Sequence, residues 1–269
     1  MRRFAALTLI ALCLALPASA APLKGDYQAG TEAHGRGDFK AALEQWQPMA
    51  EAGDRRAQYA IGFMYQFGQG VPLDYKKAFE YFEMAARQND TDAQYALGML
   101  LEQGLGTGRR DYRAALEWYV RAADGGGNPN ADFAAGRMYF RALGTNRNLG
   151  AAFERFRKAA LQGHPAAQYA LGSMFEVGTE TIPENPAQAW FWYSMAAKTD
   201  PKVLAEYDPA YRPQVALQGL KERISAPELK LAEDWVRRGA MEEALKSMAP
   251  IAPVPRSDKE GVERRDRRG

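Results

Sequence analysis

The sequence predicts an all-α chain of about five repeated pairs of antiparallel helices, the first one degenerate, followed by a C-terminal helical cap. The first observation is a set of landmark residues that recurs four times in one register. Its aromatic members are separated by 36, 38 and 36 residues, and such a period is the sequence signature of a repeat protein. The landmarks are Tyr59, Tyr95, Phe133 and Tyr169; Gly62, Gly98, Gly136 and Gly172; Ala78, Ala115, Ala152 and Ala189; and Ala85, Ala122, Ala159 and Ala196.

The second observation is capping chemistry, which divides each repeat into two helices. The first helices are expected at 56–67, 92–103, 130–141 and 165–177, and the second at 75–88, 112–124, 149–162 and 186–198. A short side chain that accepts a hydrogen bond from a free helical N–H precedes each second helix, namely Asp74, Asp111, Asn148 and Asn185. Residues suited to the left-handed conformation follow second helices, namely Gly53, Asn89, Gly126 and Gly163.

A glycine inside each first helix indicates a close contact between helices. Glycine at such a position costs about 1 kcal/mol relative to alanine, yet it recurs at Gly62 and its three counterparts. We therefore expect Gly62 to let the first helix cross close to Ala78 of the second, with the same contact in each repeat.

The N-terminal end departs from the repeat. Residues 26–35 and 39–52 are expected to form a degenerate helix pair, in which Pro48 kinks the second helix. Atypical terminal repeats act as caps, because an end repeat has a neighbour on one side alone.

The C-terminal end also leaves the register, after Asp200. A helix is expected at 214–224, and a capping box formed by Ser225 and Glu228 opens a further helix at 227–248. The sequence leaves the fold of 201–213 open.

The first twenty residues have the pattern of a secretory signal peptide. Arg2 and Arg3 precede an apolar run at 4–16, and small residues at 18–20 suit a signal peptidase. The run is shorter than the roughly 20 apolar residues that cross a bilayer. Cys13, the single cysteine, follows a leucine rather than a small residue, which argues against a lipid anchor. Cleavage after residue 20 predicts a periplasmic or secreted protein without cysteine.

Removal of residues 1–20 leaves 33 basic and 33 acidic side chains, so the mature chain is close to neutral. Nucleic-acid-binding proteins normally have a basic surplus, so neither nucleic-acid binding nor membrane insertion after signal cleavage is expected. The predicted divisions are a signal peptide at 1–20, a degenerate repeat at 21–54, four repeats at 55–90, 91–126, 127–163 and 164–200, a helical cap at 201–249, and a disordered Pro-rich and charged tail at 250–269.

One repeat carries a specific family resemblance. Residues 57–74 read A-Q-Y-A-I-G-x-M-Y-x-x-G-x-G-V-x-x-D, and A-x-x-Y-x-x-x-A-A follows at 78–86. This pattern resembles the SEL-one-like repeat, a relative of the tetratricopeptide repeat, and the resemblance extends over residues 26–200. It is weaker at 130–163, where Ala142 replaces a loop glycine and Arg155 replaces an aromatic residue.

The resemblance implies an α-solenoid that binds other proteins or peptides. Members of the family serve as adaptors in signalling, in envelope and exopolysaccharide regulation, and in host contact. A disulfide-rich secreted branch is linked to penicillin binding, but the mature chain lacks the cysteines of that branch. The chain is therefore similar to a bacterial secreted member without disulfides.

No catalytic or metal-binding constellation stands out. His34 and His164 do not have a metal-ligand spacing, and His164 is interpreted as a turn and cap residue. Ser194 and Lys198 lie four apart on one helix, a spacing that many surface neighbours share. The glycine-rich residues 104–108 follow a helix, whereas a phosphate-binding loop follows a strand. We expect no catalytic residue, no metal and no cofactor.

The candidates for partner binding are residues of the first helices that differ between repeats, although the landmark residues around them recur. In tetratricopeptide-like solenoids, which the chain resembles, the first helices line the concave face. Five helices spaced by about 10 Å would form a groove of roughly 40–50 Å, which holds an extended peptide of roughly a dozen residues. The predicted partner-binding residues are Phe63, Gln66, Met99, Glu102, Arg137, Phe140 and Glu176.

The predicted function is a non-catalytic protein-interaction scaffold or adaptor in the bacterial cell envelope. The partner would be a protein or peptide held on the concave face. Two alternatives stay open. One is an envelope enzyme or regulatory subunit acting on peptidoglycan or exopolysaccharide, and the other is a purely structural role in an envelope complex.

Overall fold

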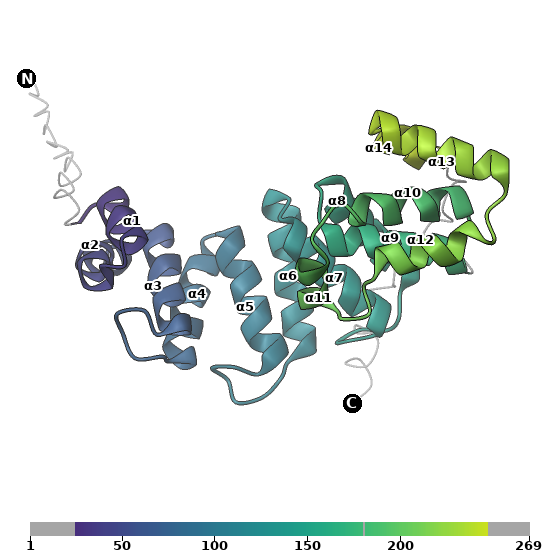
Figure 1. The fold of residues 1–269 in the computed structure, drawn as a ribbon. Coiled ribbons are helices and arrows are strands. Elements are labelled where there is room, and N and C mark those ends of the chain that lie inside the picture. The colour runs from purple at the N-terminus through teal and green to yellow at the C-terminus, as the bar shows by residue number, and fades with distance from the viewer. Residues whose placement is uncertain (1–24, 180, 247–269) are drawn as a thin grey trace, which may run out of the picture.

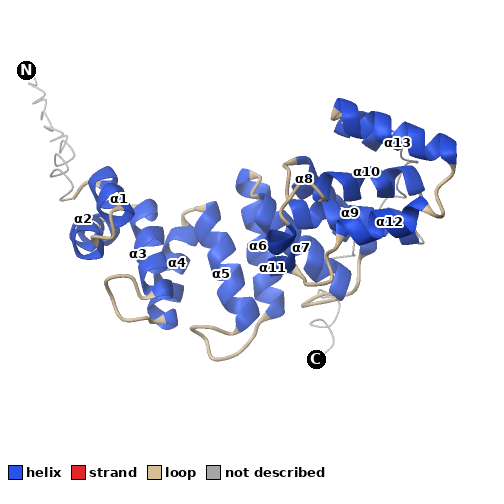
Figure 2. Ribbon diagram, viewed as in Figure 1, coloured by secondary structure: helices blue, strands red, loops and turns tan. Residues whose placement is uncertain are grey.

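The computed structural model describes residues 25–179 and 181–246, and every regular element within these ranges is a helix (Figure 2). From α1 to α10, each helix packs against the one that follows it in the chain. The helix pairs stack along an elongated, arched molecule (Figure 1), which confirms the predicted all-α solenoid. The helices are α1 Tyr27–Gly35, α2 Phe39–Glu51, α3 Arg55–Phe67, α4 Tyr75–Arg87, α5 Thr91–Gln103, α6 Tyr112–Gly126, α7 Pro129–Arg141, α8 Leu149–Leu161, α9 Pro165–Val177, α10 Pro186–Ala196, α11 Pro201–Tyr207, α12 Pro213–Lys221, α13 Ala226–Arg238 and α14 Met241–Lys246.

The predicted caps of the second helices are present. Asp74 accepts hydrogen bonds from two backbone N–H groups of the first turn of α4, each at 3.0 Å. Its counterparts in the later repeats each accept a bond from the N–H group three residues further on. Asn89 adopts the left-handed conformation, with φ of 61°. The expectation for Gly126 was wrong, because α6 continues through it and the left-handed residue is Gly127, with φ of 64°.

The glycine inside each first helix makes room for an aromatic ring, not for the small residue that we expected. A Cβ atom at Gly62 would lie 2.7 Å from the ring of Phe82 on α4, which is closer than van der Waals contact allows. The glycines of the next three repeats meet Tyr119, Phe156 and Tyr193 in the same way, and Gly30 in α1 meets Trp46. The degenerate first pair therefore follows the same packing rule as the other repeats.

The C-terminal region differs from the expectation in two respects. The helix expected at 227–248 is divided, because Gly239 adopts φ of 63° and ends α13 before α14 begins. Residues 201–207, whose fold the sequence left open, form α11. The predicted signal peptide and the predicted C-terminal tail at 250–269 lie outside the described residues.

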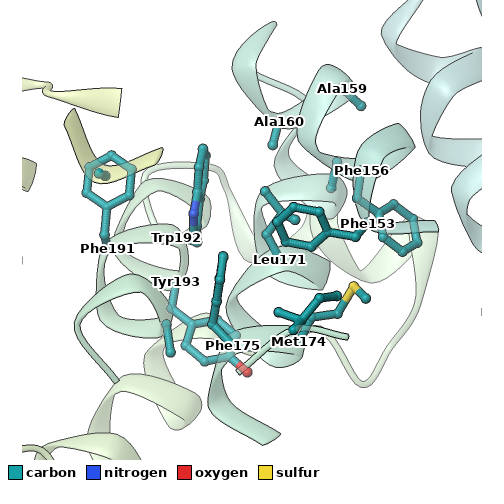
Figure 3. Close-up of a cluster of buried hydrophobic side chains, with 14 of the residues drawn as sticks. Phe153, Phe156, Ala159, Ala160, Leu171, Met174, Phe175, Phe191, Trp192 and Tyr193 are labelled. Atoms are coloured by element: carbon teal, nitrogen blue, oxygen red, sulfur yellow. The ribbon is translucent and has the colours of Figure 1, made fainter. Parts of the chain in front are cut away.

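Aromatic side chains fill the space between helices in the C-terminal half (Figure 3). Phe153 of α8 meets Phe175 of α9 edge to face, with ring centroids 5.5 Å apart. Trp192 of α10 is fully buried and donates its indole N–H to the side chain of Gln188 at 3.1 Å. Burial of a large side chain of this kind stabilises the fold by about 2–3 kcal/mol, so these rings fix the helices whose outer faces form the candidate site.

Candidate functional site

The seven predicted partner-binding residues lie on the first helices α3, α5, α7 and α9, and all are at least partly exposed. Residues next to several of them enter the core instead. Met64, Leu100 and Met138, which follow Phe63, Met99 and Arg137, are fully buried. We call the solvent-facing side of α3, α5, α7 and α9 the first-helix surface.

Two glutamates on this surface are bound to neighbouring helices. Glu102 of α5 accepts a hydrogen bond from the hydroxyl of Tyr119 at 2.9 Å and forms an ion pair with Arg137 of α7 at 2.5 Å. Glu176 of α9 likewise accepts a bond from Tyr193, at 2.7 Å, and pairs with Arg223. The structure thus brings together Glu102 and Arg137 from the predicted set, and part of their role is to tie adjacent repeats together.

The tyrosines that donate to these glutamates are the rings that pack against the inner glycines. Burial raises the pKa of Tyr119 and of Tyr193, and the adjacent carboxylate acts in the same direction. Both phenols therefore stay protonated and act as hydrogen-bond donors. This arrangement suits a structural link better than acid–base chemistry.

The N-terminal part of the first-helix surface is apolar. The rings of Phe63 and Phe67 lie 4.5 Å apart on α3, and Phe67 is 54% exposed. Met99 occupies the position of Phe63 on the next first helix and is also partly exposed. Sequence reasoning missed Phe67, although its place on the same face as Phe63, four residues earlier, could have identified it.

The C-terminal part of this surface contains a small pocket between α7 and α9. Its volume is about 140 Å³, and its lining includes Arg137, Phe140, Tyr169, Ser173 and Tyr211. Two of these, Arg137 and Phe140, were predicted. Tyr169 was assigned to the repeat frame alone, and Tyr211 comes from a segment whose path the sequence did not determine.

A segment of the chain itself lies on α7 and α9. Tyr207, at the end of α11, contacts the ring of Phe133 at 5.5 Å, and Tyr211 stacks on Tyr169 at 4.6 Å. Figure 1 shows α11 and α12 running in front of α7 and α9. The predicted groove along all five first helices is therefore not open over its whole length, because the C-terminal segment covers part of it.

The residues considered for chemistry have structural partners. His164 is the N-cap of α9, as interpreted: its Nδ1 accepts the N–H of Ala167 at 3.2 Å, and burial lowers its pKa to about 4. Lys198 donates to the sulfur of Met195 at 3.4 Å rather than to Ser194. Within the described residues, no group of three or more His, Cys, Asp or Glu side chains is arranged to hold a metal ion.

The glycine-rich residues 104–108 form the loop that we expected. Gly106 has φ of 79°, and a Cβ atom there would lie 2.6 Å from the carbonyl oxygen of Tyr75 at the start of α4. The loop thus packs against the preceding repeat. None of the described helices combines the length and the hydropathy of a membrane-spanning segment.

Comparison with curated proteins identifies relatives that share the repeats. The chain is 36% identical over 182 residues to DAP3-binding cell death enhancer 1 of Rattus norvegicus, a match that covers 55% of this chain and 36% of that protein. The chain spans between 18% and 36% of the length of the curated relatives it matches.

Solved structures share the fold. A protective antigen of uropathogenic Escherichia coli that displays an SLR fold aligns with a TM-score of 0.65 and 26% identity, over 80% of this chain and 45% of that one. A Sel1 repeat protein from Oxalobacter formigenes aligns with a TM-score of 0.62 and 24% identity, over 77% and 88% of the two chains. A family model for the Sel1 repeat matches residues 55–90, 91–127, 129–164 and 165–198. These matches account for more than half of the sequence, so the chain belongs to the Sel1 repeat family, whose SEL-one-like pattern its repeats resemble.

Proposed function

We propose that this chain is a non-catalytic scaffold that binds a protein or peptide through the concave face formed by its first helices. Sel1 repeat proteins are generally interaction scaffolds. The observation that carries the proposal is the apolar part of the first-helix surface, where Phe67 is 54% exposed and Phe63 and Met99 pack against the core yet stay partly exposed. Aromatic side chains and methionine are enriched in protein interfaces.

We further propose that the protein acts in the bacterial cell envelope, as a periplasmic or secreted protein. The support is the signal-peptide pattern at residues 1–20. Fractionation of the producing cell, with mass determination of the N-terminus, tests this. A mature chain that begins at Ala21 and lies outside the cytoplasm is the expected result, and an uncleaved cytoplasmic chain would contradict it.

The binding face is tested by site-specific photo-cross-linking in the cell of origin. A photoreactive amino acid replaces Phe67 or Met99 on the first helices, and a matched control replaces Glu80, an exposed residue of α4. We expect the first two positions to cross-link the same partner protein and the control position to give no product. Cross-linking from Glu80 alone would place the partner on the other side of the helix pair.

The charged part of the surface is tested by a substitution that leaves the helices intact. Arg137→Gln removes the cation that pairs with Glu102, whereas Arg113→Gln removes a cation on α6 whose side chain is 84% exposed. We expect the first variant to lower partner capture about fivefold and the second to leave it unchanged, with equal helicity by circular dichroism. If the protein captures no partner and instead turns over a cell-wall fragment or a β-lactam, the scaffold proposal fails.

A further inference from the structure

The segment that lies on the first-helix surface, residues 207–212, joins α11 to α12 and is held mainly by side-chain contacts. Tyr207 sits edge-on to Phe133 of α7 and also contacts the ring of His164, with centroids 5.0 Å apart. Four residues later, Tyr211 stacks on Tyr169 of α9, with an interplanar angle of 28°. We call residues 207–212 the strap.

Both rings of the strap rest on repeat landmarks. Phe133 and Tyr169 occupy the same position in successive repeats, at which Tyr59 and Tyr95 stand in the first two. Between the two rings the chain forms a turn, in which the N–H of Tyr211 donates to the main-chain carbonyl of Asp208 at 2.9 Å and the N–H of Ala210 donates to the Asp208 side chain at 2.9 Å. This turn places the two tyrosine rings against adjacent first helices, which lie about 10 Å apart. The spacing of the two tyrosines thus matches the spacing of the repeats.

Polar contacts fix the direction of the strap. The carboxylate of Asp208 forms an ion pair with Arg141 at 3.2 Å, and the hydroxyl of Tyr169 donates to the main-chain carbonyl of Ala210 at 3.3 Å. Arg141 lies four and eight residues after Arg137 and Phe133, so all three side chains share one face of α7. The surface therefore binds an aromatic ring, a carboxylate, a main-chain carbonyl and a second ring in that order.

Most of the strap is solvent-exposed, although Tyr211 packs against the core of the C-terminal half. Tyr207 is 41% exposed, and Pro209, Ala210 and Arg212 are exposed as well. The Arg141–Asp208 pair is also solvent-accessible, and such pairs contribute about 1 kcal/mol or less. The pocket of about 140 Å³ remains beside Tyr211, so the strap does not fill the surface completely. Firm burial begins at Leu204 and Pro213, on either side of it.

We infer that the strap is an internal occupant of a peptide-binding site on α7 and α9. The site takes a partner segment of the same chemistry, in which two aromatic residues stand four apart and an acidic residue follows the first. The inference rests on the proposed scaffold function and names its partner class. When the partner binds, the strap leaves the surface while α11 and α12 stay attached through Leu204 and Pro213.

Occupation by the strap has a quantitative consequence. A tethered segment competes at an effective concentration in the millimolar range. The apparent affinity of an external peptide is its intrinsic affinity multiplied by the fraction of molecules in which the site is open. Loosening the strap should therefore raise the affinity for the partner segment.

The test uses a fluorescent ten-residue peptide with the sequence of residues 204–213 as the probe and the full chain as the receptor. Fluorescence anisotropy compares the wild type with a chain that carries Tyr207→Ala, Asp208→Asn and Tyr211→Ala. We expect the loosened chain to bind the probe about tenfold more tightly. Adding Arg141→Ala to the loosened chain should lower its affinity for the probe about threefold, because an exposed ion pair with the acidic residue of the probe is lost. A control peptide with both tyrosines replaced by alanine should not bind.

Hydrogen exchange on the wild-type chain supplies a second measurement, which does not depend on the folding of a variant. An excess of the probe should speed exchange in the strap, residues 207–212, while the amides of α7 and α9 stay protected. The inference is overturned if exchange in this segment does not change at probe concentrations that saturate the loosened chain. It is also overturned if the loosened chain binds no more tightly than the wild type, or if the control peptide binds equally well.

Failure of this inference is distinguishable from failure of the scaffold function. If the probe does not bind but cross-linking from Phe67 captures a partner, the scaffold stands and the assignment to α7 and α9 is wrong. If neither binds, both fail.

Discussion

At the scale of single residues, the third repeat has an ion pair where the second repeat has two uncharged side chains. Asp132 stands where the second repeat has Gln94, and Arg155 stands where it has Trp118. Asp132 is 1% exposed and accepts a hydrogen bond from Arg155 at 3.1 Å, while Arg155 also binds Asp124 through two nitrogens. These two differences from the second repeat therefore compensate each other.

Removing one member of this pair should be costly. Arg155→Leu leaves the buried carboxylate of Asp132 without its cation, and we expect a loss of about 3 kcal/mol in the free energy of unfolding. The double variant Asp132→Gln with Arg155→Trp installs the residues of the second repeat and should recover at least half of that loss. Urea unfolding checks both, and equal destabilisation of the two variants would contradict the compensation.

His164 makes stability depend on pH. Its pKa is lowered by burial to about 4 from an ordinary value of 6.5, so the unfolded chain binds more protons between these values. The contribution of the neutral ring is complete above pH 6.5 and is lost as the pH falls toward 4, by up to about 3 kcal/mol. Urea unfolding at pH 7, 6, 5 and 4.5 measures it.

The matched control is His164→Asn, because Asn128 caps α7 at the equivalent position. This variant keeps a capping side chain and removes the titrating group. Its stability should fall less steeply with decreasing pH than that of the wild type. Parallel pH profiles would mean that other groups cause the dependence.

A missing side chain at Gly125 leaves another buried group unpaired. In the first repeat, Gln88 donates its amide to the side-chain oxygen of Gln58 at 2.8 Å. Gly125 takes the place of Gln88 in the second repeat, and the side-chain oxygen of Gln94 has no hydrogen-bond partner among the described residues.

Gly125→Gln should therefore stabilise the chain. We expect a gain of about 1 kcal/mol from helix propensity and from the new hydrogen bond to Gln94. Gly125→Ala is the control, since it gains propensity alone and meets the same contact with Thr91 at 3.2 Å. Thermal unfolding should rank the glutamine variant above the alanine variant, and the reverse order would exclude the hydrogen bond.

At the scale of the helix pair, the unit of packing is a glycine under an aromatic ring. It recurs in all five pairs, with a ring that differs in kind but not in position. The tyrosine versions in the second and fourth repeats also reach a glutamate on the first helix. The same contact therefore fixes the crossing of the two helices and orients Glu102 and Glu176 on the first-helix surface.

Filling this contact should destabilise the pair. Gly136→Ala places a methyl group 2.7 Å from the ring of Phe156, and the resulting overpacking should cost about 1–3 kcal/mol. Gly219→Ala in α12 meets nothing within 4 Å and should instead gain up to about 1 kcal/mol from helix propensity. Thermal unfolding of both variants checks the opposite signs. Two stabilising substitutions would show that the ring can move aside.

At the scale of the whole molecule, each pair depends on its neighbours, and the last repeat depends on the C-terminal helices. Phe191 of α10 is fully buried and meets Trp235 of α13 edge to face, with centroids 6.4 Å apart. In a solenoid, stability is approximately a sum of repeat terms and nearest-neighbour interface terms. The helices α12 and α13 supply the interface on which α10 relies.

A chain that ends at Thr199 should lose the protection of its last repeat. Exposure of Phe191 and its surroundings removes about 2 kcal/mol or more of hydrophobic stabilisation, so amides of α9 and α10 should exchange faster while those of α3 to α6 are unchanged. Hydrogen exchange with mass spectrometry measures this, with a chain ending at Lys246 as the control. Uniformly faster exchange would contradict nearest-neighbour stability.

The repeat, its helices and most of their ends could be predicted from the sequence. Period, caps and glycines are local features, and each is set by residues within one turn or one repeat. The sequence also indicated Phe63, Met99 and Arg137 as partner-binding candidates on the first helices, and all three are partly exposed there. The contact of each inner glycine was predicted wrongly. Helical periodicity shows which face of a helix is buried, but it does not show which side chain of the neighbouring helix packs against that face.

The path of the C-terminal segment could not be predicted from the sequence. Residues 201–213 carry no periodic pattern that fixes a path, and their position depends on contacts with Phe133, Arg141 and Tyr169, more than 40 residues earlier in the chain. The same contacts turned an expected open groove into a surface partly covered by the chain itself. Pairing across such a separation is set by packing in space, and local sequence patterns do not encode it.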